Sequence, residues 1–532
     1  MVSVSVLFGF WCLVVGSRGQ TQETGSNPCA RRDFGETSFV CVCNETYCDT
    51  LLRPTLPQKG EFLLYSSDMK DKRFLKSLHN FTEKEHVCEV LLHPYALLPN
   101  GQKSIAVDFI LDPTITQQEI IGWGGALSDS AAATILSVPE VLQDMLLSSY
   151  FSEHGSEYNL IRTNMGGCDF SWRLYTHADT EGDIELATFA LQSEDTDFKI
   201  PILKRIMDMA ANSIKVFASP WSAPPWMKTN NDYVGIGELR EDMYQVWANY
   251  FLKFVEAYAA ENITMWGMTL QNQPRVCNTG TTTFNCMGWT PEQQRKWLAE
   301  NLGPTLKENG YGDLKLMIMD DTRYELGRWP QVVLGDPTAK QYASGIAVHW
   351  YTDTWVSPDK LDDVHSLFPD IFILNTEACE GNFPTQPDVI LGSWERGEHY
   401  ARNIIENMNH WMNGWLDWNL ALNMEGGPSW ISNFLDSPII VNKDAGEFYK
   451  NPMFYAKAHF SKFIKPNARK VELTKSEVLD VDAVAFKNVD GSIVMVISNR
   501  QENTVEVRVD VLGRGTMVFV VTPRSLHTVI FI

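Results

Sequence analysis

The spacing of apolar residues predicts two kinds of structure in this chain. Between residues 118 and 466, short apolar runs alternate with longer segments of helical periodicity, such as Glu238–Ala260 and Pro291–Gly303. The runs have the length of buried strands, and they are Asn159–Asn164, Ile214–Ser219, Ile263–Thr269, Leu314–Met319, Ile346–Trp350, Ile371–Leu374 and Gly414–Leu422. This alternation predicts parallel β/α units, and seven or eight units fit a closed (β/α)8 TIM barrel. A doubly wound open sheet is the alternative, but no Gly-x-Gly-x-x-Gly follows an expected strand.

The last part of the chain follows a different pattern. Val505–Val509 alternates strictly between apolar and polar residues, as a half-buried strand does. Asp490-Gly491 separates two apolar runs, which is typical of a β-hairpin. We therefore expect an all-β sandwich domain formed by residues 467–532 together with the strand-rich stretch 51–117.

The N-terminus carries a targeting signal in its pattern. Val4–Val15 is almost wholly apolar but short, and Ser17-Arg18-Gly19 follows it. This predicts a signal peptide over residues 1–19 rather than a membrane anchor or a buried strand. A signal peptide indicates a lysosomal or secreted protein. In such a protein the Asn-x-Ser/Thr sites are glycosylation acceptors, and they lie at Asn44, Asn80 and Asn262.

Four cysteines crowd into residues 20–50, at Cys29, Cys41, Cys43 and Cys48. In an oxidising compartment such a cluster predicts two disulfides in a small N-terminal β segment, although spacing alone allows three pairings. A zinc site is the alternative, but histidine ligands are missing nearby. Three of the scattered cysteines show no matching partner in the sequence, and we expect them to be unbonded: Cys168, Cys286 and Cys379.

Charge narrows the range of partners. The formal net charge of -22 argues against nucleic acid and against simple electrostatic docking on anionic lipid at neutral pH. This repulsion weakens in an acidic compartment, where many carboxylates are partly protonated. No histidine stands in metal-ligand spacing, so neither a metal nor an organic cofactor is implied.

Polar and aromatic residues follow the expected barrel strands, at the ends where barrel enzymes carry their active sites. They are Asp169, Trp221, Asn272, Gln273, His349, Tyr351, Glu377 and Trp418. Singly, each has a structural interpretation: Asp169 could cap a helix, Glu377 could be a paired carboxylate, and the tryptophans could be core. Together they predict a sugar site, because carboxylates and amides bind hydroxyls while indoles cover the apolar faces of the ring.

Motifs at these positions resemble the lysosomal acid glucosylceramidase (glucocerebrosidase) family of retaining glycoside hydrolases, and the likeness runs from about Cys29 to the end of the chain. The matching stretches are Cys41-Val42-Cys43-Asn44, Tyr47-Cys48-Asp49, Gly122-Trp123-Gly124-Gly125-Ala126, Cys168-Asp169-Phe170-Ser171, Ala218-Ser219-Pro220-Trp221, Ala347-Val348-His349-Trp350-Tyr351, Thr376-Glu377-Ala378-Cys379, Asp417-Trp418-Asn419-Leu420 and Asp436-Ser437-Pro438-Ile439-Ile440-Val441.

The resemblance implies hydrolysis of glucosylceramide to glucose and ceramide with retention, and it assigns roles to residues. Glu377 matches the nucleophile, and Gln273 stands where the family has the acid/base Glu of an Asn-Glu-Pro triplet. The substrate-binding positions are Asp169, Trp221, Asn272, His349, Tyr351, Trp418 and Asn433. The resemblance also implies Cys29–Cys41 and Cys43–Cys48 disulfides, and as partners a glycosphingolipid at a membrane surface and a saposin-type activator protein.

Gln273 departs from the family pattern in a way that affects chemistry. Glutamine matches glutamate in size but cannot titrate, and losing general acid–base help lowers rates by about a hundred- to ten-thousand-fold. Neither Gln271 nor Glu380 is an obvious substitute. We expect an active glucosylceramidase that reacts faster with activated aryl glucosides; the alternatives are an impaired or silent relative that binds glucolipid, and a hydrolase of another carbohydrate.

Overall fold

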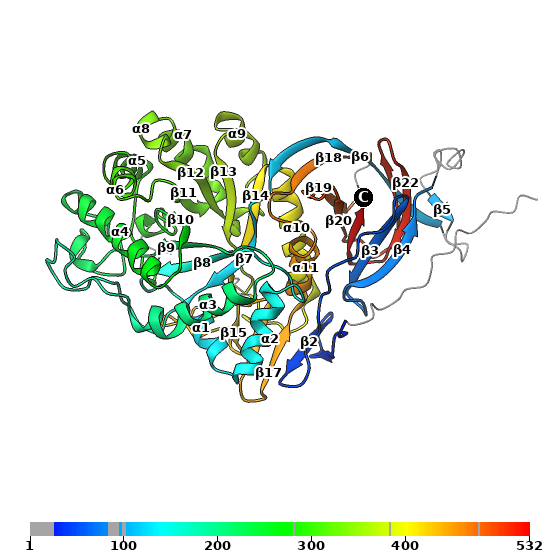
Figure 1. The fold of residues 1–532 in the computed structure, drawn as a ribbon, viewed down its shortest axis with the longest axis horizontal. Coiled ribbons are helices and arrows are strands. Elements are labelled where there is room, and N and C mark those ends of the chain that lie inside the picture. The colour runs from blue at the N-terminus through cyan, green and yellow to red at the C-terminus, as the bar shows by residue number, and fades with distance from the viewer. Residues whose placement is uncertain (1–25, 83–94, 98–102, 280–281, 382–384, 477–478) are drawn as a thin grey trace, which may run out of the picture.

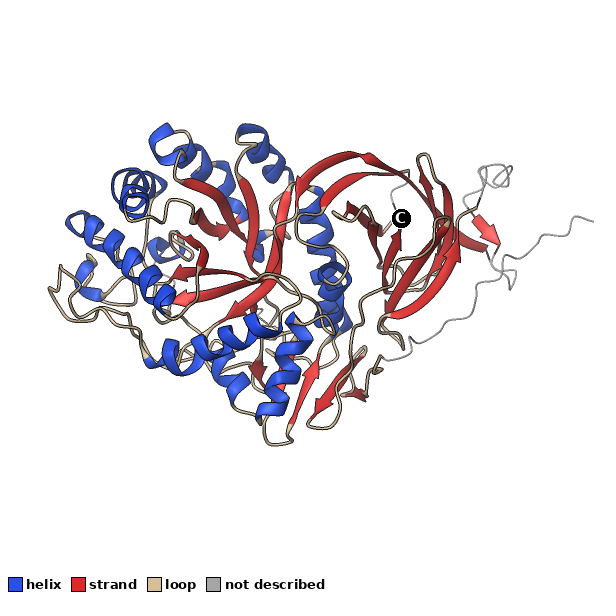
Figure 2. Ribbon diagram, in the orientation of Figure 1, coloured by secondary structure: helices blue, strands red, loops and turns tan. Residues whose placement is uncertain are grey.

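The computed structural model describes residues 26–82, 95–97, 103–279, 282–381, 385–476 and 479–532. The expected signal peptide and Cys88 lie outside these residues. The chain forms two bodies side by side, a barrel surrounded by helices and a β-sandwich whose described residues form no helix (Figures 1 and 2). Helices α10 (Trp394–Asn409) and α11 (Pro452–Ser461) lie between the two bodies.

The barrel confirms the fold expected from the sequence. Eight strands pair in parallel around a closed ring: β7 (Gly122–Leu127), β8 (Leu160–Met165), β9 (Lys215–Pro220), β10 (Met265–Thr269), β11 (Lys315–Thr322), β12 (Ala343–His349), β13 (Phe372–Glu377) and β14 (Met412–Asn419). The glycine-rich β7 shows no apolar run, which is why only seven strand runs stand out in the sequence. A buried layer that includes Phe217, Met317 and Leu374 fills the interior and leaves the strand ends for chemistry.

Helices cover the outside of the barrel, as the 3.6-residue periodicity predicted. Besides α10 and α11 they are α1 (Asp129–Leu136), α2 (Glu140–Phe151), α3 (Ile200–Met209), α4 (Tyr244–Ala260), α5 (Pro291–Trp297), α6 (Gly303–Glu308), α7 (Trp329–Leu334), α8 (Pro337–Lys340) and α9 (Asp359–Leu367). Thr290 and Gln293 form a capping box that starts α5, so two backbone N–H groups at this end are satisfied. A π-helical turn, Glu194–Lys199, leads directly into α3.

The sandwich is formed from both ends of the chain, as expected. Its strands are β3 (Glu61–Asp68), β4 (Leu75–Asn80), β5 (Tyr95–Leu97), β6 (Lys103–Glu119), β18 (Arg469–Lys475), β19 (Val481–Lys487), β20 (Ile493–Asn499), β21 (Val505–Val511), β22 (Gly515–Val521) and β23 (Ser525–Phe531). Strands β19 and β20 form the predicted antiparallel hairpin, and Gly491 adopts a φ of 86° in its turn. The alternating valines of β21 lie in the buried core.

The N-terminal segment is attached to the barrel loops rather than folded alone. Its strands β1 (Arg31–Asp33) and β2 (Phe39–Asn44) join β17 (Glu447–Lys450), β16 (Ile439–Asn442) and β15 (Leu422–Asn423) in one sheet. The expected Cys29–Cys41 and Cys43–Cys48 disulfides are both present. The disulfides link β2 to the residues before and after it in the chain. Strand β2 pairs with β17, which belongs to the segment that follows β14.

One expectation about the cysteines is wrong. Cys286 is bonded to Cys277, nine residues away, and both are buried. The Thr-rich stretch between them has no periodicity, so nothing in the sequence indicated that it folds back on itself. Cys168 and Cys379 are free and buried, as expected.

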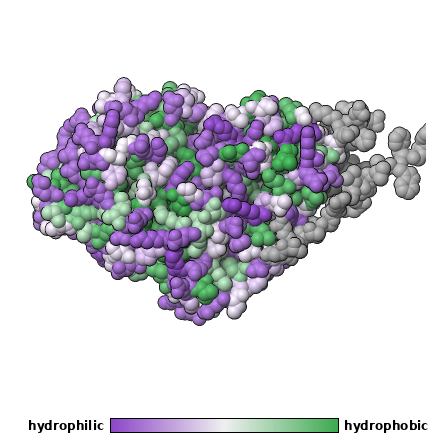
Figure 3. Space-filling view, viewed as in Figure 1, coloured by the Kyte–Doolittle hydropathy of each residue, from purple (hydrophilic) through white to green (hydrophobic). Residues whose placement is uncertain are grey.

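The surface is mixed in character. In the view of Figure 3, hydrophilic residues dominate and hydrophobic ones occur in small scattered groups. Two of the glycosylation acceptors, Asn80 and Asn262, are exposed, whereas Asn44 is half-buried and accepts a hydrogen bond from Thr46 Oγ1 (2.9 Å). Among the described residues no helix is long and apolar enough to cross a membrane.

Candidate active site

The structure gathers the expected site residues at the carboxyl ends of the barrel strands. Asp169 follows β8, Trp221 follows β9, Asn272 and Gln273 follow β10, His349 ends β12, Tyr351 lies in the turn after it, Glu377 ends β13, Trp418 lies in β14 and Asn433 follows β15. All of them therefore lie at one end of the barrel, on the side where barrel enzymes place their active sites.

Arg162 is the centre of the site, although it was not among the residues expected there. Its guanidinium donates hydrogen bonds to Glu377 Oε2, to Asn272 Oδ1 (2.8 Å) and to Asp320 Oδ2 (2.9 Å). The Arg162 side chain is fully buried, so these ionic contacts are shielded from water. Arg162 thus fixes the carboxylate of Glu377 and the amide of Asn272 relative to each other.

Asp320, the second residue missed by the sequence analysis, owes its position to an irregularity in β11. The register between β11 and β12 shifts between Met319 and Asp321, and both Met319 and Asp320 adopt positive φ angles, 71° and 63°. Such a bulge re-aims a side chain, and here it directs Asp320 toward Arg162 and His349. Burial raises the pKa of Asp320, but the charges of Arg162 and His349 outweigh burial and hold that pKa well below its usual range.

Glu377 has a second polar partner besides Arg162. Tyr351 donates its hydroxyl to Glu377 Oε1 at 2.7 Å. Burial keeps the pKa of Tyr351 well above its ordinary value, so this hydroxyl stays a donor. Glu377 itself is 6 % exposed. The Glu377 carboxyl group is therefore oriented from two sides and almost dehydrated, which suits a nucleophile.

Gln273 lies beside Glu377. Gln273 Nε2 is 3.4 Å from His349 Nδ1, and Glu377 Oε1 is 3.7 Å from the same atom, so the two groups are no more than about 7 Å apart. Retaining glycosidases separate their two carboxyl groups by about 5–5.5 Å. Gln273 also adopts a φ of 44°, a left-handed conformation held by its N–H donating to the Asp320 carbonyl at 2.9 Å.

His349 lies between these two groups. Its Nε2 donates to Asp320 Oδ1 at 3.0 Å, which leaves Nδ1 facing Gln273 and Glu377. Burial lowers the pKa of His349, but the charges of Glu377 and Asp320 outweigh burial and raise that pKa above its ordinary value of 6.5. Acidic conditions therefore favour the imidazolium form.

Two tryptophans form a wall next to the ion cluster. Trp221 and Trp418 stack with ring centroids 5.2 Å apart, and the guanidinium carbon of Arg162 lies 5.0 and 5.3 Å from their rings. Each is only 2 % exposed. The wall is therefore rigid and apolar.

Asp169 and Asn433 form a further polar pair at this end of the barrel. Asn433 donates its amide to Asp169 Oδ2 at 3.0 Å. Burial, and then the negative charge of Glu377, raise the pKa of Asp169 to about 7. The side chain is therefore largely neutral in an acidic medium and both accepts and donates hydrogen bonds there.

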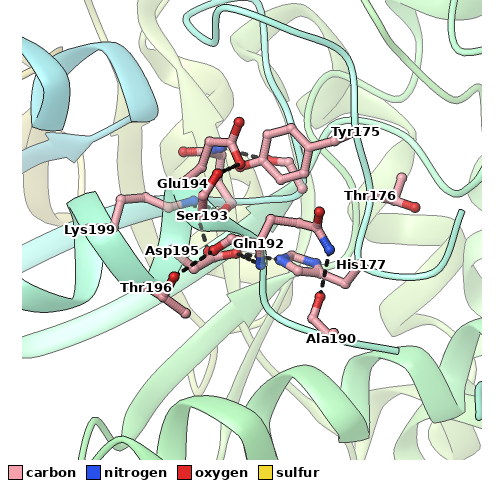
Figure 4. Close-up of polar contacts among 12 residues, drawn as sticks. Tyr175, Thr176, His177, Ala190, Gln192, Ser193, Glu194, Asp195, Thr196 and Lys199 are labelled. Carbon is pink, nitrogen blue, oxygen red and sulfur yellow. Dashed lines mark hydrogen bonds and ion pairs between the residues drawn. The ribbon is translucent and has the colours of Figure 1, made fainter. Parts of the chain in front are cut away.

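The segment that carries Asp169 is anchored by a buried polar network. Ser171 donates to Asp129 Oδ2 at 2.5 Å, and Asp129 also contacts Lys199 at 2.9 Å. Figure 4 shows the network beyond Lys199, where Asp195 contacts Lys199 at 3.1 Å and His177 at 2.8 Å. The network fixes the loop after β8 against α1 and against the π-helical turn that precedes α3.

Two other side chains weighed as proton donors are engaged elsewhere. Glu380 accepts a hydrogen bond from His399 Nδ1 at 2.6 Å, and His399 belongs to α10. Gln271 donates its amide to the Trp221 carbonyl at 2.7 Å. Neither has a recorded contact with Gln273 or His349.

Among the described residues, no group of three potential metal ligands within reach of one ion forms at the strand ends. Within the described part of the chain, the groups of three candidate ligands are Cys43, Cys48 and Asp49, two of which share a disulfide, and Asp359, Asp362 and His410 on α9 and after α10. Neither group includes a residue of the site.

Comparisons with known proteins agree with this geometry. Residues 120–464 match the family model "Glycosyl hydrolase family 30 TIM-barrel domain", and residues 467–529 match the "Glycosyl hydrolase family 30 beta sandwich domain". The chain is 42% identical over 510 residues to the mouse lysosomal acid glucosylceramidase, covering 95% of each chain. It is 36% identical to putative glucosylceramidase 4 of Caenorhabditis elegans, over 100% of this chain and 99% of that relative. The crystal structure of SrfJ from Salmonella typhimurium superposes with a TM-score of 0.78 at 26% identity, covering 88% of this chain and 99% of that one.

Proposed function

The chain belongs to the glucosylceramidases of glycosyl hydrolase family 30, and on that premise we propose that it hydrolyses glucosylceramide to glucose and ceramide with retention of anomeric configuration. The observation that carries the proposal is Glu377 at the end of β13, oriented by Arg162 and Tyr351 in a buried site. The relatives' substrate and the carboxylate's environment support the same reaction.

The reaction begins with Glu377. Its carboxylate attacks the anomeric carbon of glucose, the bond to the ceramide oxygen breaks, and a covalent glucosyl-enzyme forms. Arg162 holds Oε2 of the Glu377 carboxylate, while Tyr351 donates its hydroxyl to Oε1. Water then attacks the same carbon and releases glucose with its original configuration.

The remaining residues hold the sugar in this proposal. Asn272, locked by Arg162, donates its amide toward the hydroxyl next to the anomeric centre. Asp169 and Asn433 bind hydroxyls further round the ring, and the Trp221–Trp418 wall limits the space for the glucose. Carboxylates, amides and indoles are the groups expected in a site for one sugar unit.

Gln273 favours a second candidate, a relative that binds glucolipid and turns it over poorly or not at all. An amide at this position supports binding of the glycosidic oxygen but supplies no proton. The two candidates share the glucose site and differ only in the fate of the bound lipid.

The setting is proposed from the same family. The expected signal peptide, the disulfides and the lysosomal relative support a lysosomal or secreted enzyme. From the family resemblance we further propose that it meets its glycosphingolipid at a membrane surface with the help of a saposin-type activator. We place the catalytic barrel at residues 118–466 and the sandwich at 51–117 and 467–532.

Turnover of glucosylceramide by the purified chain, beside its Gln273→Glu and Glu377→Gln variants, tests the proposal. We expect measurable glucose release by the unmodified chain, more by Gln273→Glu and none by Glu377→Gln. Binding of glucosylceramide without glucose release by the unmodified chain would support the second candidate. No release by either the unmodified chain or Gln273→Glu would reject the proposed substrate.

A further inference from the structure

The proposed reaction needs a proton donor, and a histidine is the titratable group next to the substituted position. His349 Nδ1 is 3.4 Å from Gln273 Nε2 and 3.7 Å from Glu377 Oε1. Its Nε2 donates to Asp320, so the ring is fixed with Nδ1 toward both groups. A general acid must reach its target directly or through one water, and this atom lies within one water of the place that a carboxyl group at residue 273 would serve.

The surrounding charges favour a protonated ring. Arg162 carries one positive charge and Asp320 and Glu377 carry two negative charges, all on side chains that are at most 8% exposed. With a neutral His349 the cluster holds an uncompensated buried negative charge, which is energetically costly. An imidazolium balances the charges of these three side chains, and because its Nδ1–H is a donor, the Gln273 amide must then turn its oxygen toward that atom. The groups that face the ring are Arg162 on β8, Asp320 and Asp321 on β11, Gln273 after β10, Tyr351 in the turn after β12, and Glu377 on β13.

We propose that His349 is the proton donor and acceptor of this enzyme, in place of the carboxyl group that Gln273 lacks; the proposal rests on the proposed glucosylceramide hydrolysis. In the first step Glu377 bonds to the anomeric carbon, and the electron pair of the broken bond stays on the glycosidic oxygen. That oxygen takes the proton of His349 Nδ1, directly or through one water that the Gln273 amide holds, and ceramide leaves as an alcohol.

The second step restores every group. Neutral His349 Nδ1 takes a proton from the attacking water, the water oxygen bonds to the anomeric carbon, and the bond to Glu377 breaks. Glu377 regains its carboxylate, glucose is released and His349 is again an imidazolium. Asp320 remains ionised throughout and keeps the ring in place.

Rival donors fit the geometry less well. Glu380 is paired with His399 of α10 at 2.6 Å, and Asp169 is held by Asn433 at 3.0 Å on the β8 side of the site. Among the described residues, His349 is the titratable side chain that contacts Gln273.

The experiment compares His349→Gln in two backgrounds, Gln273 and Gln273→Glu. In the Gln273 background we expect glucosylceramide turnover to fall by about a hundredfold or more. In the Gln273→Glu background the same change lowers glucosylceramide turnover by less than about tenfold, because a carboxyl group now supplies the proton. Trapping of Glu377 by an activated 2-fluoroglucoside shows that each variant is folded. The rate of trapping falls much less than glucosylceramide turnover, because the leaving group of the activated glucoside needs no proton.

The responses of turnover to azide and to pH distinguish proton transfer by His349 from a purely structural role of that residue. Azide needs no base, so it speeds turnover of an activated aryl glucoside by His349→Gln but hardly by the unmodified chain. The unmodified chain loses glucosylceramide turnover as pH rises above 6.5, and the difference between it and His349→Gln isolates this loss from the titration of Asp169.

The outcomes separate the hypotheses. Equal losses from His349→Gln in both backgrounds, or a fall in trapping as large as the fall in turnover, would overturn the proton-donor role. Loss of glucosylceramide turnover in Glu380→Gln would overturn it in favour of Glu380. If no variant is labelled on Glu377, the proposed function fails first and the role of His349 fails with it.

Discussion

Two buried histidine–aspartate pairs at the barrel have similar contacts, but the second ring nitrogen of each histidine has a different environment. His349 donates to Asp320 at 3.0 Å, and His177 contacts Asp195 at 2.8 Å; each aspartate also contacts a buried cation, Arg162 in the first pair and Lys199 in the second. The second nitrogen of His177 is 2.8 Å from the Tyr250 hydroxyl, so that ring is satisfied on both sides.

The second nitrogen of His349 instead faces Gln273 at 3.4 Å, a long contact. A closed network stabilises the fold, whereas a network with one open end can exchange a proton with a ligand. The difference indicates that a buried histidine–aspartate pair serves function when the second ring nitrogen of its histidine has no close partner, and not because the pair exists. Substitutions that break one network and spare the other test this reading.

The largest expected effect belongs to Glu377. Glu377→Gln removes the proposed nucleophile while keeping its size, and we expect turnover of both glucosylceramide and activated glucosides to fall by about 10⁴-fold or more. Glucose release measured with both substrates checks it. Glu380→Gln, a buried glutamate close by in sequence, is the matched control and should keep its activity within about twofold. Comparable losses in the two variants would place the chemistry elsewhere.

The closed network should affect stability instead of catalysis. His177→Gln removes one hydrogen-bond partner each from Asp195 and Tyr250, and loss of a buried hydrogen-bond partner lowers the free energy of unfolding by about 1–3 kcal/mol. We expect a lower apparent Tm in a thermal scan but trapping per folded molecule within about threefold of the unmodified chain. A stable but inactive His177→Gln protein would contradict the comparison.

A gain of function is expected at Gln273. Gln273→Glu should raise glucosylceramide turnover by roughly ten- to a hundredfold, the lower part of the range for general acid–base catalysis, if His349 already transfers protons as we propose. The rate at which an activated aryl glucoside forms the glucosyl-enzyme should change less than glucosylceramide turnover. Steady-state assays with the two substrates provide the measurement, and an unchanged rate with glucosylceramide would mean that residue 273 does not face the leaving group.

The smallest effect concerns Asp169 and pH. Its pKa is raised from 3.8 to about 7 in the folded protein, so the charged form is disfavoured there and stability is lost as pH rises between these values. Asp169→Asn removes this loss. We therefore expect the variant to show a higher apparent Tm than the unmodified chain at pH 8 and a similar Tm at pH 4. An equal difference at both pH values would reject the shifted pKa.

Much of the fold could be predicted from local patterns, because buried parallel strands and amphipathic helices are visible in single segments. The glycine-rich β7 was not visible as an apolar run, since its burial comes from neighbouring strands. The Cys277–Cys286 disulfide was missed because it depends on the path of an irregular loop. Both failures concern features set by tertiary contacts.

The site divides in the same way. Residues that follow strand ends, such as Glu377 and Gln273, were found by position and by family motif. Arg162 and Asp320 were missed, although an arginine inside an apolar strand and an aspartate after the Leu314–Met319 run were available signals. The bulge that turns Asp320 inward has no signature in the sequence. The partnership of His349 with Gln273 is likewise a matter of tertiary geometry.

We propose that this chain is a retaining glycosidase whose nucleophile is Glu377. Incubation with an activated 2-fluoroglucoside, followed by peptide mapping with mass spectrometry, tests this proposal most directly. We predict one added fluoroglucosyl group per chain, on the peptide that contains Glu377, and no label in the Glu377→Gln variant. Labelling of a different carboxylate, or a folded protein that reacts with no activated glucoside, would contradict it.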